Sequence, residues 1–248
     1  MMNKIKTIML TIALLVFISP LSAIEASDIL KKVDENMVAK SVVSEGKMTI
    51  YTKRGSREMI SKNYSRGETH SFTEYLYPER EKGTKMLKLD DRLWIYSPAT
   101  DRTIQLSGHM LRQSVMGSDL SYEDMMEDRS LNEMYSAVIE GEEEMDGVMC
   151  WKLQLTATVE DVAYHSRDIW VDKQRFVPMR EELFAKSGQL LKRTKMSEVT
   201  KIGNRWYPKK INYKDMLSNG QGTDFEMISV EFDVDIPEII FNKASLTK

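Results

Sequence analysis

The sequence is poor in the residues that build covalent and catalytic sites. Its 248 residues include one cysteine and three histidines. A single cysteine excludes an intramolecular disulfide, so the fold must be stabilised by a packed core. The histidines, at positions 70, 109 and 165, lie far apart and match no paired metal-ligand spacing. There is also no G-x-S-x-G nucleophile motif. We therefore expect no metal site, no cofactor and no enzymatic activity.

Long hydrophobic runs are also missing, except at the N-terminus. There, two lysines precede an apolar run from Ile8 to Ile18, and small residues follow at Ala23 and Ala26. This is the pattern of a secretory signal, and the run is too short for a transmembrane helix. No cysteine lies near the cleavage site to carry a lipoprotein anchor. We predict a signal peptide at residues 1–23, a single mature domain at residues 24–248, and an exported protein that is not an integral membrane protein.

A strong charge of either sign is absent as well. The net charge is −3, and removal of the two lysines within residues 1–23 brings it to −5. No basic cluster accompanies this mild acidity. Nucleic acids and anionic lipid surfaces attract concentrated positive charge, so we expect neither as a partner.

What the sequence does contain is alternation of apolar and polar residues from Gly46 almost to the end. Turn signals such as Asp146-Gly147 separate these segments, which indicates roughly ten antiparallel strands. A sheet of that size curls, so we expect a mainly β protein with helices, its strands forming an unclosed β-barrel. Before the strands, residues 27–37 predict an amphipathic helix with Ser27 as its N-cap and an apolar face that includes Ile29, Leu30 and Val33.

The stretch Ser107–Asp128 interrupts the alternation. Its spacing predicts two short amphipathic helices hinged at Gly117-Ser118, the second with a capping box formed by Ser121 and Asp124. These helices would form a lid over an apolar concavity, or they would form an ordinary crossover whose methionines fill the core. Methionine suits a lid because its flexible side chain packs equally well against protein and lipid. The lid candidates for lipid contact are Met110, Leu111, Val115, Met116, Leu120 and Met125.

The strand just before this stretch carries large side chains on both faces. Leu93 and Ile95 point one way, while Trp94 and Tyr96 point the other. Both faces must therefore be covered. Since the lid stretch follows at once, we expect it to cover Trp94 and Tyr96, which complete our set of candidate lipid-binding residues. Each tryptophan fits equally well as plain core.

Several of these segments resemble one known family. The segments PEREKGTKMLKLDDRLWIY, TDRTIQLSGHMLRQSVMGSDLSYEDMM and RWYP are similar to the LolA-like, outer-membrane lipoprotein-sorting proteins of bacterial periplasms. They are closest to the branch often encoded beside RND-type exporters. The resemblance runs from about Ser27 to Leu246. Well-known members hold the lid with an early-strand arginine, but none of Arg54, Arg57 and Arg66 lies in a matching motif.

The resemblance implies a periplasmic carrier that holds the acyl chains of lipids or lipoproteins under a lid and passes them toward the outer membrane. An inner-membrane RND-type transporter is the partner that it suggests. The alternative is a periplasmic sensor of the RseB type, in which ligand binding regulates a protein partner. Known sensors carry a second small domain that we do not find in this sequence.

The lid hypothesis predicts the effect of placing charge on the apolar side of the lid. Met116→Asp combined with Leu120→Asp should weaken acyl-chain binding while the sheet still folds, because a carboxylate is poorly tolerated against a hydrocarbon chain. A lipid-binding assay together with circular dichroism measures both effects. Loss of the folded state in the double variant would instead identify these residues as ordinary core.

Overall fold

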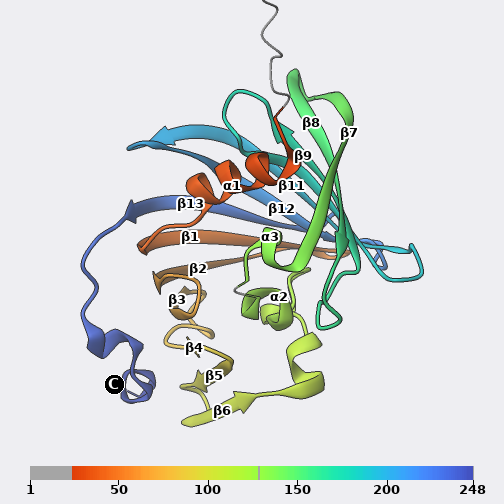
Figure 1. The fold of residues 1–248 in the computed structure, drawn as a ribbon. Coiled ribbons are helices and arrows are strands. Elements are labelled where there is room, and N and C mark those ends of the chain that lie inside the picture. The colour runs from red at the N-terminus through yellow and green to blue at the C-terminus, as the bar shows by residue number, and fades with distance from the viewer. Residues whose placement is uncertain (1–23, 128, 248) are drawn as a thin grey trace, which may run out of the picture.

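Thirteen strands form one antiparallel sheet in the computed structural model, which describes residues 24–127 and 129–247 (Figure 1). The signal peptide predicted at residues 1–23 lies outside the described residues. The curved, unclosed antiparallel sheet expected from the sequence is confirmed. The strands are β1 (Ser41–Thr52), β2 (Gly55–Arg66), β3 (His70–Tyr77), β4 (Lys85–Leu89), β5 (Arg92–Ser97), β6 (Arg102–Leu106), β7 (Tyr135–Met145), β8 (Val148–Ala157), β9 (Ser166–Asp172), β10 (Pro178–Phe184), β11 (Leu190–Ile202), β12 (Arg205–Asp215) and β13 (Thr223–Phe232).

The strand number exceeds the ten expected from the sequence because several strands are very short. β4, β5 and β6 have five or six residues each, and tight turns separate them. Asp90, in the turn between β4 and β5, has a φ of +51°, so the chain reverses within two residues there. Asp146 and Gly147 form the hairpin turn between β7 and β8, as predicted, with φ values of +50° and +83°.

The strand order explains where the sheet is open. It runs β6-β5-β4-β3-β2-β1-β13-β12-β11-β10-β9-β8-β7, so two hairpin-connected halves meet where β1 pairs with β13. That pairing extends from Val42 opposite Phe232 to Ile50 opposite Thr223. β6 and β7 are consecutive in the chain but lie at opposite edges of the sheet. The residues between them must therefore travel from one edge to the other.

Short helices cover both the concave face and part of the outer face. The N-terminal helix packs Ile29, Leu30 and Val33 against a cluster that includes Leu153 of β8 and Ile169 of β9. No helix within the described residues is long and apolar enough to cross a membrane. The helices are α1 (Ala26–Met37), α2 (Tyr122–Met126), α3 (Leu131–Met134), and the 3₁₀ helices η1 (Gly108–Arg112), η2 (Val115–Gly117), η3 (Glu238–Phe241) and η4 (Lys243–Leu246).

The apolar face predicted for the first helix is confirmed, but its predicted start is wrong. Helix α1 begins at Ala26 with Glu25 as its N-cap residue, so Ser27 lies exposed within the first turn. Ala26 is 7% exposed and belongs to the buried cluster under the helix. Burial of this small apolar residue extends the helix one position beyond the capping signal, which is a tertiary effect.

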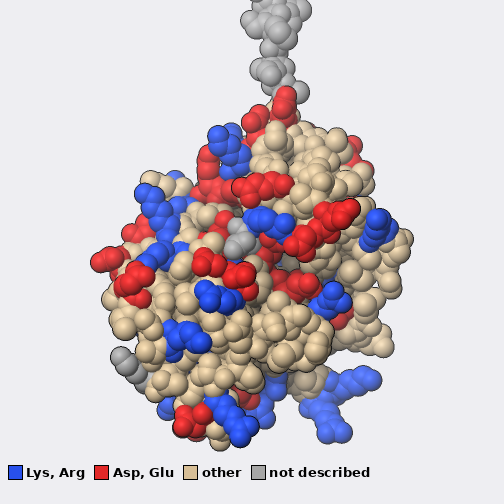
Figure 2. Space-filling model, turned by 60° about the horizontal axis from the view of Figure 1, so that its bottom comes forward, with Lys and Arg blue, Asp and Glu red and all other residues tan. Residues whose placement is uncertain are grey.

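Charged side chains of both signs lie interspersed on the face drawn in Figure 2. A surface of mixed charge produces no strong field of one sign. Attraction of a highly charged partner to this face would therefore be weak, and recognition must depend on features beneath the surface.

The packing of helix α1 predicts a large loss of stability on truncation. Leu30→Ala should lower the free energy of unfolding by about 2–5 kcal/mol, because Leu30 is 1% exposed and its removal leaves a cavity. Lys31→Ala, on the exposed side of the same helix, is the matched control and should change stability by less than about 0.5 kcal/mol. Urea unfolding measures both; equal effects would show that the helix does not anchor this part of the core.

Candidate functional site

The connection from β6 to β7 crosses the concave face of the sheet. We call residues 107–126 of it the lid segment; it comprises η1, η2 and α2. Only α2 is an α-helix, so the first of the two helices predicted from the sequence is wrong. Met116 and Gly117 both have left-handed backbones, with φ of +52° and +80°. This break leaves too few residues on its N-terminal side for a hydrogen-bonded α-helix.

The capping box predicted at the second helix is confirmed. The backbone nitrogen of Asp124 donates to the Ser121 hydroxyl at 3.2 Å, and the backbone nitrogen of Ser121 donates to the Asp124 carboxylate at 2.8 Å. These two bonds satisfy amide groups that a five-residue helix could not satisfy internally. The turn therefore has a defined start despite its length.

The apolar side of the lid segment packs onto the half of the sheet formed by β1 to β5. Met48 of β1, Met59 of β2 and Met86 of β4 are buried beneath it. Val115 is 3% exposed, whereas most of its apolar neighbours on the lid are half-buried. The structure thus brings together all six predicted lid candidates: Met110, Leu111, Val115, Met116, Leu120 and Met125.

The other two candidates do not join them. Trp94 and Tyr96 lie on the opposite face of β5, in a separate cluster with Ile236, Phe241 and Leu246. The expectation that the lid covers these aromatic residues is wrong, because the C-terminal 3₁₀ helices η3 and η4 cover them instead. The lid covers Leu93 and Ile95. Alternation on β5 was correct, but it could not tell which cover lies on which face.

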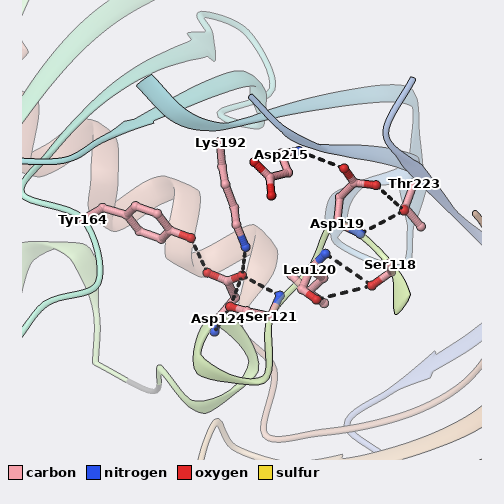
Figure 3. Close-up of polar contacts among 9 residues, drawn as sticks. All are labelled: Ser118, Asp119, Leu120, Ser121, Asp124, Tyr164, Lys192, Asp215 and Thr223. Carbon is pink, nitrogen blue, oxygen red and sulfur yellow. Dashed lines mark hydrogen bonds and ion pairs between the residues drawn. The ribbon is translucent and has the colours of Figure 1, made fainter. Parts of the chain in front are cut away.

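Asp119 attaches the middle of the lid segment to the last two strands of the sheet (Figure 3). Its carboxylate accepts from the Thr223 hydroxyl at 2.7 Å and from the backbone nitrogen of Asp215 at 3.0 Å. Its own backbone nitrogen donates to the Thr223 hydroxyl at 3.1 Å. Three hydrogen bonds thus join this one lid residue to the ends of β12 and β13.

Asp124 makes a second attachment, to β11 and to the loop before β9 (Figure 3). Its carboxylate pairs with the ammonium group of Lys192 and accepts from the hydroxyl of Tyr164 at 2.5 Å. Burial alone would raise the pKa of Asp124. The charge of Lys192 and the hydrogen bonds from Lys192, Ser121 and Tyr164 more than offset burial and hold that pKa below its usual value.

Two basic residues complete the attachment, and the sequence did not identify either role. Arg57 of β2 donates to the backbone oxygen of Met116, at the break in the lid. Lys88 of β4, only 3% exposed, donates to the backbone oxygen of Met126 at 3.1 Å. Arg57 was one of three early-strand arginines noted in the sequence, and only its position beneath Gly117 distinguishes it.

The lid segment has a cavity on each side. One, of about 130 Å³, lies toward β1 to β4 and is lined by apolar residues that include Met48, Val115 and Met125. The other, of about 260 Å³, lies toward β9 to β12. Leu120 lines both cavities. The lid therefore divides one concave interior into two adjoining spaces.

Among the described residues, no cluster of three or more potential metal ligands occurs. Cys150 is fully buried, and burial raises the pKa of its thiol to about 11. A thiol of that pKa stays protonated at neutral pH and is a poor nucleophile. His109, beside the lid, is exposed. The polar groups near the lid are paired with the sheet, an arrangement that holds the segment in place.

Comparison with known proteins places this architecture in a family. A family model described as "Uncharacterized protein"-like matches residues 67–248. A DUF1329 family protein from Desulfovibrio piger is 25% identical, with a TM-score of 0.80 over 88% of this chain and 96% of the other. No protein of curated description matches the sequence.

Two further solved structures share the fold. A putative outer membrane lipoprotein-sorting protein domain from Vibrio parahaemolyticus is 22% identical, with a TM-score of 0.77 over 90% of this chain and 97% of the other. A LolA superfamily protein from Nitrosomonas europaea is 24% identical, with a TM-score of 0.72 over 90% of this chain and 100% of the other. At these identities the likeness shows the fold.

The Asp124–Lys192 pair predicts a pH-dependent contribution to stability. Asp124→Asn should lower the free energy of unfolding by about 3 kcal/mol at pH 7, because it leaves the Lys192 ammonium buried without its partner. The native pKa of Asp124 is lowered, so its contribution is complete above the unfolded pKa of about 3.9 and is lost as the pH falls through the native pKa.

The difference between wild type and Asp124→Asn should therefore shrink below about pH 4. Urea unfolding between pH 7 and pH 2 measures it, with Asp91→Asn as the control because the side chain of Asp91 is 91% exposed. A difference that stays constant across this range would mean that ionisation of Asp124 does not stabilise the lid.

Proposed function

This chain belongs to the "Uncharacterized protein"-like, LolA-like family matched over residues 67–248, and from that premise we propose that it is a periplasmic carrier of acyl chains. The ligands would be the hydrocarbon chains of lipids or lipoproteins, held without chemical change. The six apolar lid residues, packed over the concave sheet between two cavities, are the observation that carries this proposal.

A carrier of this kind needs an enclosed apolar site. A sixteen-carbon chain exposed to water costs on the order of 12 kcal/mol, at about 0.8 kcal/mol per methylene. Met48, Met86 and Met125 offer flexible side chains that can pack against a hydrocarbon chain as readily as against one another. Methionines thus line both the sheet side and the lid side of the proposed site.

Entry of a ligand requires the lid to move. The two cavities, of about 130 and 260 Å³, are each smaller than the roughly 300–1,000 Å³ of typical ligand pockets. The lid is attached by a few polar contacts at Asp119, Asp124 and the backbone oxygens of Met116 and Met126. Hydrogen bonds exchanged with water contribute only about 0.5–1.5 kcal/mol each, so opening would cost a modest free energy that bound lipid can offset.

The destination of the cargo and the partner follow from the family resemblance. The names of two structural relatives refer to outer membrane lipoprotein sorting and to the LolA superfamily. We include transfer toward the outer membrane, with an inner-membrane RND-type transporter as partner, in the proposed function. The six lid residues are the proposed acyl contacts, whereas Trp94 and Tyr96 lie behind the sheet and would act only through its packing.

The proposal predicts a bound lipid. Native mass spectrometry of protein purified gently from periplasm should detect added mass that extraction identifies as an acylated molecule. Leu120→Asp, at the wall shared by both cavities, should reduce the loaded fraction by about tenfold or more, because a carboxylate there must be desolvated.

Val138→Asp is the matched control, since Val138 on the edge strand β7 is 57% exposed and far from the lid in the strand order. It should retain wild-type loading. A wild-type protein that is reproducibly empty, and that also rejects added phospholipid and lipoprotein, would contradict the carrier function.

A further inference from the structure

The larger of the two cavities contains a band of polar side chains on an otherwise apolar concave face. Glu181 of β10 lies opposite Thr194 of β11, and Thr194 lies opposite Tyr213 of β12. Arg167 of β9 lies opposite Leu183, two residues from Glu181, and so projects from the same face. All four side chains line the cavity of about 260 Å³. They come from four adjacent strands, so the sheet itself fixes their spacing.

Two of these groups lack hydrogen-bond partners within the described structure. The Thr194 side chain is 3% exposed and its hydroxyl is unpaired, as is the buried Nε of Arg167. The guanidinium of Arg167 lies 5.0 Å from the ring centre of Tyr135 and 5.6 Å from that of Tyr164. Buried polar groups are normally paired, because an unsatisfied one is costly. These groups therefore point to a ligand that supplies hydrogen bonds.

The remaining walls of this cavity are apolar. Leu131 and Met134 of α3 line it, together with Leu183 and Met196 of the sheet. Leu120 of the lid connects it to the smaller apolar cavity. Across the same boundary, the ring of Tyr213 contacts that of Phe225 with 5.2 Å between centres. A molecule that occupied both spaces would need a polar group at one end and a hydrocarbon chain at the other.

The charges around the cavity favour an uncharged polar group. Arg167 and Glu181 carry opposite charges, and Lys192 is already paired with Asp124. Burial raises the pKa of Glu181, and the charge of Arg167 opposes that shift. Glu123 on the lid adds a further negative charge, which disfavours an anion. A neutral group with several donors and acceptors fits these surroundings.

We propose that this polar band binds the neutral glycerol-ester head of an acylglycerol, while its acyl chain lies against the apolar residues of the lid. The hydroxyl groups of Thr194 and Tyr213 each donate and accept, as glycerol hydroxyls do. Arg167 donates to the ester oxygen, and Glu181 accepts from a glycerol hydroxyl. This inference rests on the carrier function and adds the head-group class that the carrier selects.

The test compares three palmitoyl ligands on the full mature protein. 1-Monopalmitoylglycerol has the neutral hydroxyl-bearing head, methyl palmitate has the same chain without hydroxyls, and palmitate has an anionic head. Monopalmitoylglycerol should bind about tenfold or more tightly than either of the others, since it alone supplies several new hydrogen bonds. Calorimetry or displacement of a fluorescent fatty acyl probe measures the three dissociation constants.

Thr194→Val should weaken monopalmitoylglycerol binding by about three- to tenfold and leave methyl palmitate unchanged, because it removes one hydrogen bond and little volume. The variant should melt at the wild-type temperature or above it, since it also removes an unpaired buried hydroxyl. Thr194→Ser, which keeps the hydroxyl, should retain the preference. Thr156→Val, at an exposed position of β8, is the matched control and should bind as wild type.

The outcomes separate the two proposals. If no palmitoyl ligand binds, the carrier function itself fails. If all three bind equally and Thr194→Val changes none of them, chains are carried without head-group selection and the polar band binds water only. A preference for palmitate would also overturn this inference, because it would identify an anion site.

Discussion

The pairing of β1 with β13 is the constraint on which the rest of the structure depends. It joins two hairpin-connected halves into one sheet and places β6 and β7 at the two outer edges. The chain between those edges must then cross the concave face. A lid is therefore a consequence of the strand order, and its apolar residues need only match the surface that they cross.

The lid is held in a way that suits reversible opening. Its apolar side contributes non-directional burial against methionines, while Asp119 and Asp124 make directional contacts with β11, β12 and β13 (Figure 3). The two kinds of contact have different roles: burial stabilises the closed position, and the polar pairs define it. Beneath the lid, apolar and polar linings lie side by side, which is the arrangement that an amphiphilic ligand requires.

Sequence patterns predicted local features of the site better than its partners. The six lid residues and the Ser121–Asp124 capping box were identifiable because helix-like spacing and capping depend on near neighbours. Trp94 was assigned the wrong cover because the segment that packs on it, near Phe241, lies over a hundred residues further along the chain. Arg57, Lys192 and the row from Glu181 to Tyr213 were missed for the same reason: strand register brings them together.

The sequence by itself determined the class of this protein: a mainly β chain with an amphipathic first helix, an interrupting lid and no catalytic motif. Apolar periodicity, turn signals and the scarcity of cysteine and histidine carry that information locally. Only the tertiary structure decided which face each cover protects, which charges hold the lid, and that four polar side chains meet in one cavity. Those outcomes depend on pairing between distant strands, which no local pattern encodes.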